Sequence, residues 1–320
     1  MKRLLLSLAL LLPVAGAYAQ EMLRPAYLQE GDQIALISPS YATPDENVEK
    51  AAEVLRSWGF VPVVGPNVGK VEAGRYAGTV QERLEDLRWA LEDPKIKAIL
   101  CNRGGYGALH LVDSLTLEEL RAHPKWLVGY SDITTLLALE NCAGIQSLHA
   151  TMGASIAKAK NALTSTQMRD FLLGNLPRYE LAAHPDNIPG RGQGMLVGGN
   201  LCTLTPLLGT RADIMASEGL ILYIEEVEES MHNIDRQFKM LENAGVLGRC
   251  RGVVLGQFTD CGQEFTYDSV EQMLRPYLEP YGIPVACGFP AGHGDVNMPL
   301  IMGATVTLDV RDDGATLSFE

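Results

Sequence analysis

A serine at a strand-to-helix turn is the first residue in this sequence that could act as a nucleophile. Residues 127–130 read as the end of a buried strand, Ser131 and Asp132 follow, and a helical pattern begins at Ile133. A hydroxyl in such a turn is exposed at the carboxyl edge of a sheet, beside backbone N–H groups that can stabilise an oxyanion. The motif lacks the second Gly of the usual nucleophile elbow, so an N-cap role for Ser131 is the structural alternative.

A glycine-rich loop, Arg103-Gly104-Gly105-Tyr106-Gly107, follows a strand predicted over 97–102. Glycines let the backbone approach a ligand closely or adopt positive φ angles. In a parallel sheet this loop would lie next to Ser131, in the crevice outside the strand ends. A plain tight turn is the alternative, and no Gly-Lys-Ser/Thr follows that would indicate a phosphate loop.

A carboxylate and a histidine in the second half of the chain complete a possible catalytic set. Glu225 ends an apolar strand, and His293 lies in a glycine-rich loop after another strand. Each has an ordinary alternative, because acidic residues at strand ends are usually solvated and a lone His is more often structural. Nucleophilic catalysis needs a base for the Ser proton and an anion to orient that base. Ser131, Glu225 and His293 are the only trio whose members all close a strand or lie just after one. His149 also ends a strand and is a candidate for lining the cleft.

Composition excludes several other classes of site. No H-E-x-x-H motif or His/Asp cluster indicates a catalytic metal, so none is expected. The six cysteines lack C-x-x-C spacing, and buried free thiols are expected for most of them. The formal charge of 26 − 39 = −13 argues against a nucleic-acid partner and against docking on anionic lipid. A soluble acidic enzyme or ligand-binding protein remains.

The elements that must position these residues alternate between strand and helix. Strands are predicted over 33–40, 60–64, 97–102, 126–130 and 145–149, with helices between them. Thr43 with Glu46, and Thr79 with Glu82, form capping-box patterns that predict the starts of two helices. This alternation indicates a doubly wound parallel sheet. A Pro- and Gly-rich segment, 175–193, is the expected linker to a smaller α/β unit with strands over 219–225, 252–258, 284–289 and 304–310.

The first residues read as an export signal. Lys2 and Arg3 precede the apolar run 4–12, and Ala17-Tyr18-Ala19 is a cleavage pattern. Cleavage after Ala19 would leave a mature chain with a formal charge of 24 − 39 = −15. The mature protein is expected to be exported to the periplasm, without stable membrane insertion. The predicted organisation is therefore a signal peptide (1–19), an N-terminal domain (20–174), a linker (175–193) and a C-terminal domain (194–320).

Five motifs in order carry a resemblance to a known family. They are Arg103–Gly107, Gly129–Asp132, Gly198-Gly-Asn-Leu201, Ile224-Glu-Glu226 with Ile234-Asp-Arg236, and Gly292-His293. Over about residues 30–318 the chain resembles the LD-carboxypeptidases (muramoyltetrapeptide carboxypeptidases), a family that includes the microcin C self-immunity peptidases.

The resemblance implies a Ser–His–Glu triad of Ser131, His293 and Glu225, with an oxyanion hole from the N–H groups of Gly105 and Asp132. It implies an amidotransferase-like N-terminal α/β domain and a smaller C-terminal α/β domain, commonly in a homodimer, with no cofactor. Arg103, Asn200 and Arg236 are candidate substrate-binding residues, and an Arg could hold the substrate carboxylate.

Two features depart from the family. Ala150-Thr151 stands where many members have Gly-Pro, and members that recycle wall peptides are typically cytosolic, whereas this chain carries an export signal.

The interpretation is a serine LD-carboxypeptidase that removes D-Ala from a murein tetrapeptide. One alternative is a peptidase of another acyl-amino-acid conjugate, as in the immunity branch. Another is a non-catalytic periplasmic binding protein, which would not need Ser131, Glu225 and His293 together.

Overall fold

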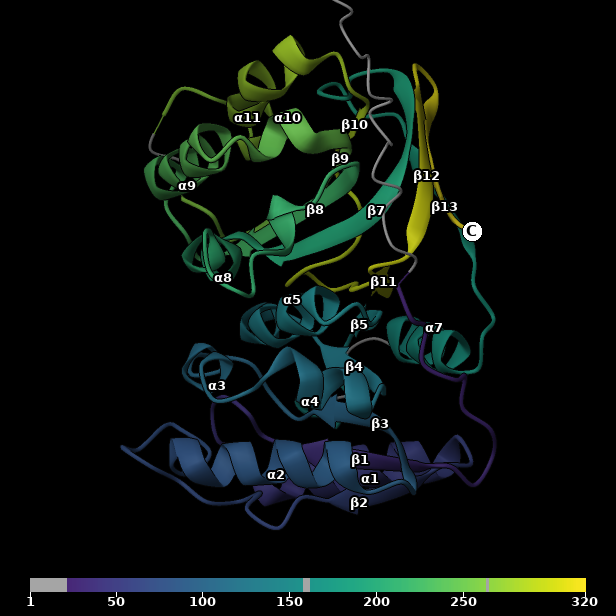
Figure 1. Ribbon diagram of the computed structural model, residues 1–320. Coiled ribbons are helices and arrows are strands. Elements are labelled where there is room, and N and C mark those ends of the chain that lie inside the picture. Colours follow the sequence, from purple (N-terminus) through teal and green to yellow (C-terminus); the bar gives the residue numbers. More distant parts are fainter. Residues whose placement is uncertain (1–21, 158–161, 263–264) are drawn as a thin grey trace, which may run out of the picture.

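Two β-sheets, each covered by helices, form the two layers of the molecule (Figure 1). The computed structural model describes residues 22–157, 162–262 and 265–320, so the predicted signal peptide lies outside the described residues. The strand orders are β11-β5-β4-β3-β1-β2 in the first sheet and β10-β9-β8-β7-β12-β13-β6 in the second. The predicted α/β class with a largely parallel first sheet and a second α/β unit is confirmed.

Five strands of the first sheet are parallel, and one antiparallel strand comes from the end of the chain. The parallel strands are β1 (Gln33–Ile37), β2 (Val61–Val64), β3 (Ile96–Cys101), β4 (Trp126–Gly129) and β5 (Ser147–His149), and β11 (Leu300–Met302) pairs with β5. In an open sheet of this order, 2-1-3-4-5, ligands bind outside the carboxyl ends of the strands near β1 and β3. The accompanying helices are α1 (Asp45–Ser57), α2 (Val80–Glu92), α3 (Leu109–Val112), α4 (Leu117–Ala122), α5 (Thr134–Cys142), α6 (Gly153–Ala157) and α7 (Ala162–Leu172).

The second sheet is half parallel and half antiparallel. The parallel strands are β7 (Gly190–Asn200), β8 (Leu220–Val227), β9 (Cys250–Thr259) and β10 (Val285–Ala286). The antiparallel strands are β12 (Thr305–Arg311), β13 (Gly314–Phe319) and β6 (Arg178–Ala182). Its helices are α8 (Leu201–Leu204), α9 (Met231–Asn243), α10 (Val246–Arg249) and α11 (Val270–Leu278).

The expected linker over 175–193 is wrong in part, because it contains β6 and the first residues of β7. Residues 178–182 alternate between exposed and buried side chains, as an edge strand does. The Pro, Gly and Asn residues that follow are typical of a loop, so the composition of the segment does not predict this short strand.

The capping box at Thr79 is confirmed, and the one at Thr43 is wrong. Glu82 N donates to Thr79 Oγ1 at 3.2 Å, and Thr79 N donates to Glu82 Oε2 at 2.8 Å. The helix predicted to start at Thr43 instead begins at Asp45, with Pro44 at the N-cap and no side-chain capping bond. Thr43 is buried, and its hydroxyl has no hydrogen-bond partner among the described residues.

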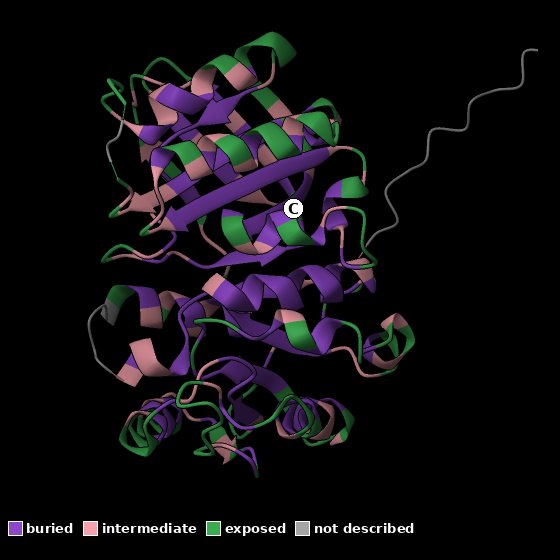
Figure 2. Cartoon of the chain, turned by 90° about the vertical axis from the view of Figure 1, so that its left-hand side faces the viewer, coloured by how far each residue is buried: buried purple, intermediate pink, exposed green. Residues whose placement is uncertain are grey.

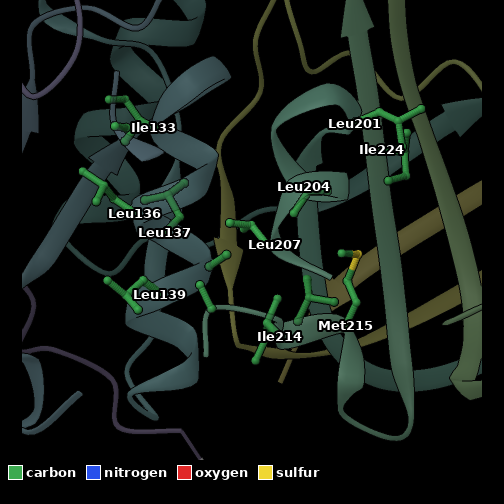
Figure 3. Close-up of a cluster of buried hydrophobic side chains, with 14 of the residues drawn as sticks. Ile133, Leu136, Leu137, Leu139, Leu201, Leu204, Leu207, Ile214, Met215 and Ile224 are labelled. Atoms are coloured by element: carbon green, nitrogen blue, oxygen red, sulfur yellow. The ribbon is translucent and has the colours of Figure 1, made fainter. Parts of the chain in front are cut away.

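A hydrophobic contact between α5 and α8 joins the two layers (Figure 3). In Figure 3, Leu207 lies next to α5, whereas Leu136 and Leu139 lie on the opposite side of α5, toward the first layer. Every residue of α5 from Thr134 to Asn141 is buried, which fits the continuous purple of the central helix in Figure 2. Burial of one such leucine contributes about 2 kcal/mol. The helix that follows Ser131 is therefore packed firmly against the layer that carries Glu225.

No helix among the described residues is both long and apolar enough to cross a membrane.

Candidate active site

Ser131 occupies a strained turn at the carboxyl end of β4. Its φ angle is +63°, in the left-handed region that costs a non-glycine residue about 1–3 kcal/mol. A short 3₁₀ turn over Ser131–Ile133 leads into α5, and neither this turn nor α5 begins with a side-chain capping bond in the described chain. The N-cap role is thus not what Ser131 performs here. The strained turn is the geometry of a nucleophile elbow.

The glycine-rich loop lies directly against Ser131. A methyl group placed on Gly104 would lie 3.2 Å from Ser131 Oγ and 3.4 Å from the backbone N of Asp132. The next residue, Gly105, has a φ of +111°, and a methyl group there would meet the Tyr41 ring at 2.2 Å. Only glycine allows this approach. The loop and the nucleophile turn therefore meet where an oxyanion could be held.

The Asp132 side chain fixes that arrangement. Its buried carboxylate accepts a hydrogen bond from Ser40 Oγ at 2.6 Å and from the backbone N of Ala108 at 2.8 Å. Ser40 follows β1 and Ala108 follows the glycine loop, so one carboxylate joins three strand ends. The backbone N–H of Asp132, beside Gly104, remains the candidate oxyanion donor.

Glu225 and His293 form a buried carboxylate–imidazole pair. His293 Nδ1 and Glu225 Oε2 are 2.7 Å apart, and the Glu225 side chain is fully buried. The His293 loop is held by the Gly292 N–H, which donates to Asn297 Oδ1 at 3.1 Å, and by the Gly294 N–H, which donates to Gln257 Oε1 at 2.8 Å. A carboxylate on Nδ1 leaves Nε2 of the imidazole to accept a proton.

Aromatic rings join the nucleophile turn to this pair across the two layers. The centroids of Tyr130 and His293 are 4.9 Å apart, those of Tyr130 and His149 are 5.9 Å apart, and those of His149 and Tyr223 are 5.1 Å apart. Tyr130 immediately precedes Ser131, and Tyr223 lies two residues before Glu225 on β8. His149 is fully buried and does not line an open cleft, which corrects the expectation for it. Burial, together with the charge of His293, lowers the pKa of His149 to about 3.

The neighbouring carboxylate, Glu226, has a different environment. Its oxygens accept hydrogen bonds from Asn200 Nδ2 and Cys202 N, both at 2.8 Å, and from Val227 N at 2.9 Å. Burial raises its pKa. Alternate residues of a strand point to opposite faces, so Glu225 meets His293 while Glu226 holds the start of α8.

The three candidate substrate-binding residues are placed differently. Arg103 is exposed at the start of the glycine loop. The Asn200 amide is buried and engaged with Glu226. Arg236 is exposed on α9, where it hydrogen-bonds Asn233, and no contact among the described residues links it to Ser131, Glu225 or His293.

A polar cavity of about 210 Å³ lies against His293. Hydroxyl groups from α6, α7 and the end of β5 line much of it, together with carboxylate and amide groups; these residues are Thr151, Ser155, Thr164, Ser165, Asp295 and Asn297. Thr151 belongs to the Ala-Thr pair that departs from the family pattern, so this departure adds a hydroxyl to the wall. A larger hollow of about 450 Å³ lies at the opposite edge of the first sheet, and none of its lining residues belongs to the site.

No group of three or more metal-binding side chains occurs among the described residues.

Comparisons with known proteins identify the family of the chain. The LD-carboxypeptidase N-terminal domain model matches residues 34–150, and the C-terminal domain model matches residues 193–308. The murein tetrapeptide carboxypeptidase of Pseudomonas aeruginosa is 30% identical over 87% of this chain and 93% of its own. The microcin C7 self-immunity protein of Escherichia coli is 26% identical over 92% of this chain and 95% of its own.

A solved structure supports the same grouping. The muramoyltetrapeptide carboxypeptidase of Oxalobacter formigenes superposes with a TM-score of 0.80 at 27% identity, covering 90% of this chain and 98% of that one. The resemblance expected from five short motifs is thus confirmed over both layers of the fold. This protein belongs to the LD-carboxypeptidase family.

Proposed function

We propose that the protein is a serine carboxypeptidase that hydrolyses the L,D-amide bond before a terminal D-amino acid. The expected substrate is a murein tetrapeptide that loses D-Ala during peptidoglycan turnover. The observation that carries the catalytic part is the 2.7 Å hydrogen bond between His293 and the buried Glu225. The murein substrate is supported by the likeness to the murein tetrapeptide carboxypeptidase of Pseudomonas aeruginosa and the muramoyltetrapeptide carboxypeptidase of Oxalobacter formigenes.

The proposed reaction begins with attack of Ser131 Oγ on the scissile carbonyl. His293 Nε2 takes the Ser131 proton, and Glu225 stabilises the imidazolium that results. The N–H groups of Gly105 and Asp132 hold the oxyanion, since the loop and the turn meet within van der Waals distance. The tetrahedral intermediate collapses as His293 donates its proton to the leaving amine. Water then enters and attacks the acyl carbonyl while His293 takes a proton from it. His293 returns this proton to Ser131 Oγ as the acyl group leaves.

A non-catalytic binding protein is the less favoured candidate. Burying a carboxylate is costly unless it is paired, and here its partner is an imidazole that packs against the residue before Ser131. Ligand binding alone gives no reason for a strained serine directly after the tyrosine that packs on this imidazole.

A peptidase of another acyl-amino-acid conjugate shares the same chemistry. It is favoured only by the likeness to the microcin C7 self-immunity protein over 92% of this chain. The two peptidase candidates differ in the leaving group and not in the roles of Ser131, His293 and Glu225.

Location and assembly form a further part of the proposal. We expect export through the signal segment 1–19, action on murein peptides in the periplasm, and a homodimer as the functional form. The acidic charge gives no basis for a nucleic-acid partner.

The experiment that tests the function uses a murein tetrapeptide and its all-L analogue as paired substrates. Mass spectrometry of the products should show release of the terminal residue from the tetrapeptide and much slower release from the analogue. Equal release from both would contradict the L,D preference, and release from neither would contradict the carboxypeptidase assignment. Testing an aminoacyl-nucleotide conjugate beside them would identify the immunity-type alternative.

A further inference from the structure

A pair of arginines that share one tyrosine ring lies beside the glycine-rich loop. The Cζ atoms of Arg75 and Arg103 each lie 5.8 Å from the centroid of the Tyr41 ring, within cation–π range. Both arginines are exposed. Neither forms an ion pair with a carboxylate in the described parts of the chain. Some other arginines do pair with carboxylates, whereas Arg24, Arg178 and Arg251 form no ion pair in the described parts of the chain; the paired ones are Arg56, Arg88, Arg169, Arg249, Arg275 and Arg311.

Tyr41 connects this charge to the reacting atoms. Its ring covers Gly105, and its backbone N donates to the carbonyl of Gly104 at 3.3 Å. Gly104 lies so close to Ser131 that a methyl group on it would be 3.2 Å from Ser131 Oγ. The backbone N of Ala42 donates to the carbonyl of Arg75 at 2.8 Å, which fixes the second arginine beside the same loop.

An anion placed between the two guanidinium groups would be attracted by both. Two guanidinium groups near one ring repel each other, and the protein carries a net charge of −13 that offers many carboxylates for neutralisation. An unpaired guanidinium presents a planar fork of N–H donors that matches a carboxylate. A peptide that is cut at its last bond brings one carboxylate close to the scissile carbonyl, at its own terminus.

We propose that Arg75 and Arg103, oriented by Tyr41, form the subsite that binds the terminal carboxylate of the substrate. The subsite restricts cleavage to the last residue of a peptide with a free carboxyl end. It rests on the proposed carboxypeptidase function. Of the two candidate arginines named from the sequence, the proposal assigns carboxylate binding to Arg103. Arg236 is not part of the subsite, because it lies on α9 and hydrogen-bonds Asn233.

The test compares one tetrapeptide with a free terminal carboxylate and the same peptide with a terminal carboxamide. The wild-type enzyme should prefer the acid by about 10- to 100-fold in kcat/KM, mainly through KM. Arg103→Gln and Arg75→Gln should each lose most of this preference by slowing only the acid. Arg103→Lys should restore part of it, because the charge returns without the planar fork.

Arg24→Gln is the matched control, because Arg24 also lies over a tyrosine, 5.0 Å from the centroid of Tyr27, away from the site. This variant should keep the full preference for the acid. Equal slowing of acid and amide in the Arg103 and Arg75 variants would overturn the subsite, because it would indicate a role in loop structure alone, while leaving the proposed function intact. Failure of the wild-type enzyme to release a residue from either peptide would overturn both.

Discussion

Replacement of Glu225 by Gln keeps the size of the side chain and removes its charge. Glu225 Oε2 lies 2.7 Å from His293 Nδ1. If the glutamine NH₂ group faces His293, it donates to Nδ1, and the imidazole proton must then sit on Nε2. A protonated Nε2 cannot accept the Ser131 proton. In the other orientation the amide nitrogen takes the place of Glu225 Oε1, which has no hydrogen-bond partner among the described residues. That orientation buries an unpaired donor and still lacks the anion that stabilises the imidazolium.

Both orientations therefore predict a large loss of rate. The equivalent substitution in a serine triad costs about 10⁴-fold in kcat, or about 5.4 kcal/mol of transition-state stabilisation. We expect kcat of Glu225→Gln to fall by about 10³- to 10⁴-fold, with KM nearly unchanged. The assay is release of the terminal residue from the tetrapeptide, with the folded fraction measured by circular dichroism.

Glu226→Gln is the control, because the two carboxylates occupy neighbouring positions on opposite faces of β8. Glu226 accepts three hydrogen bonds, so its variant should lose about 1–3 kcal/mol of stability. The folded fraction should retain a kcat near that of the wild type. If Glu225→Gln is silent, or if Glu226→Gln lowers kcat as much, the wrong carboxylate has been assigned.

Three further predictions concern other parts of the molecule. Mass spectrometry of the natively produced protein should give an N-terminus at Gln20, whereas full-length protein in the cytoplasm would contradict export. Light scattering should give twice the mass of the mature chain, and a monomer at working concentration would contradict the homodimer. The lowered pKa of His149, about 3 against about 6.5 in an unfolded chain, means that the unfolded state binds more protons between these values. The free energy of unfolding should therefore fall below pH 6.5 by up to about 1.4 kcal/mol per pH unit. In urea titrations at several pH values, His149→Phe should reduce this pH dependence. An unchanged pH dependence would exclude His149 as its source.

The sequence predicts the first layer well because its elements carry strong local signals. The Thr79 capping box predicts the start of α2, and the apolar runs predict the parallel strands, without any information from distant residues. The strand β6 was missed because an edge strand with one exposed face lacks an apolar run. The strand β11 was missed because its three residues pair with β5, far away in the sequence.

Of the candidate site, the sequence could indicate which residues end strands, but not which face they present. Glu225 and Glu226 are adjacent residues of the same type, so their sequence context does not tell them apart. Only the register of β8 decides which one meets His293. The role of Asp132 in joining Ser40 to Ala108 has no local signal, because its partners come from other strand ends. The same holds for the ring contacts of Tyr130 with His293 and of His149 with Tyr223, which form only when the two layers pack.

The central claim is that Ser131 and His293 act as one unit, and kcat of the double variant Ser131→Ala/His293→Ala tests it most directly. Each single variant should lose about 10⁴- to 10⁶-fold, and the double variant should be little slower than either one. Losses that multiply in the double variant would show two independent contributions and contradict the triad. A loss of only tenfold for Ser131→Ala in a fully folded protein would contradict Ser131 as the nucleophile.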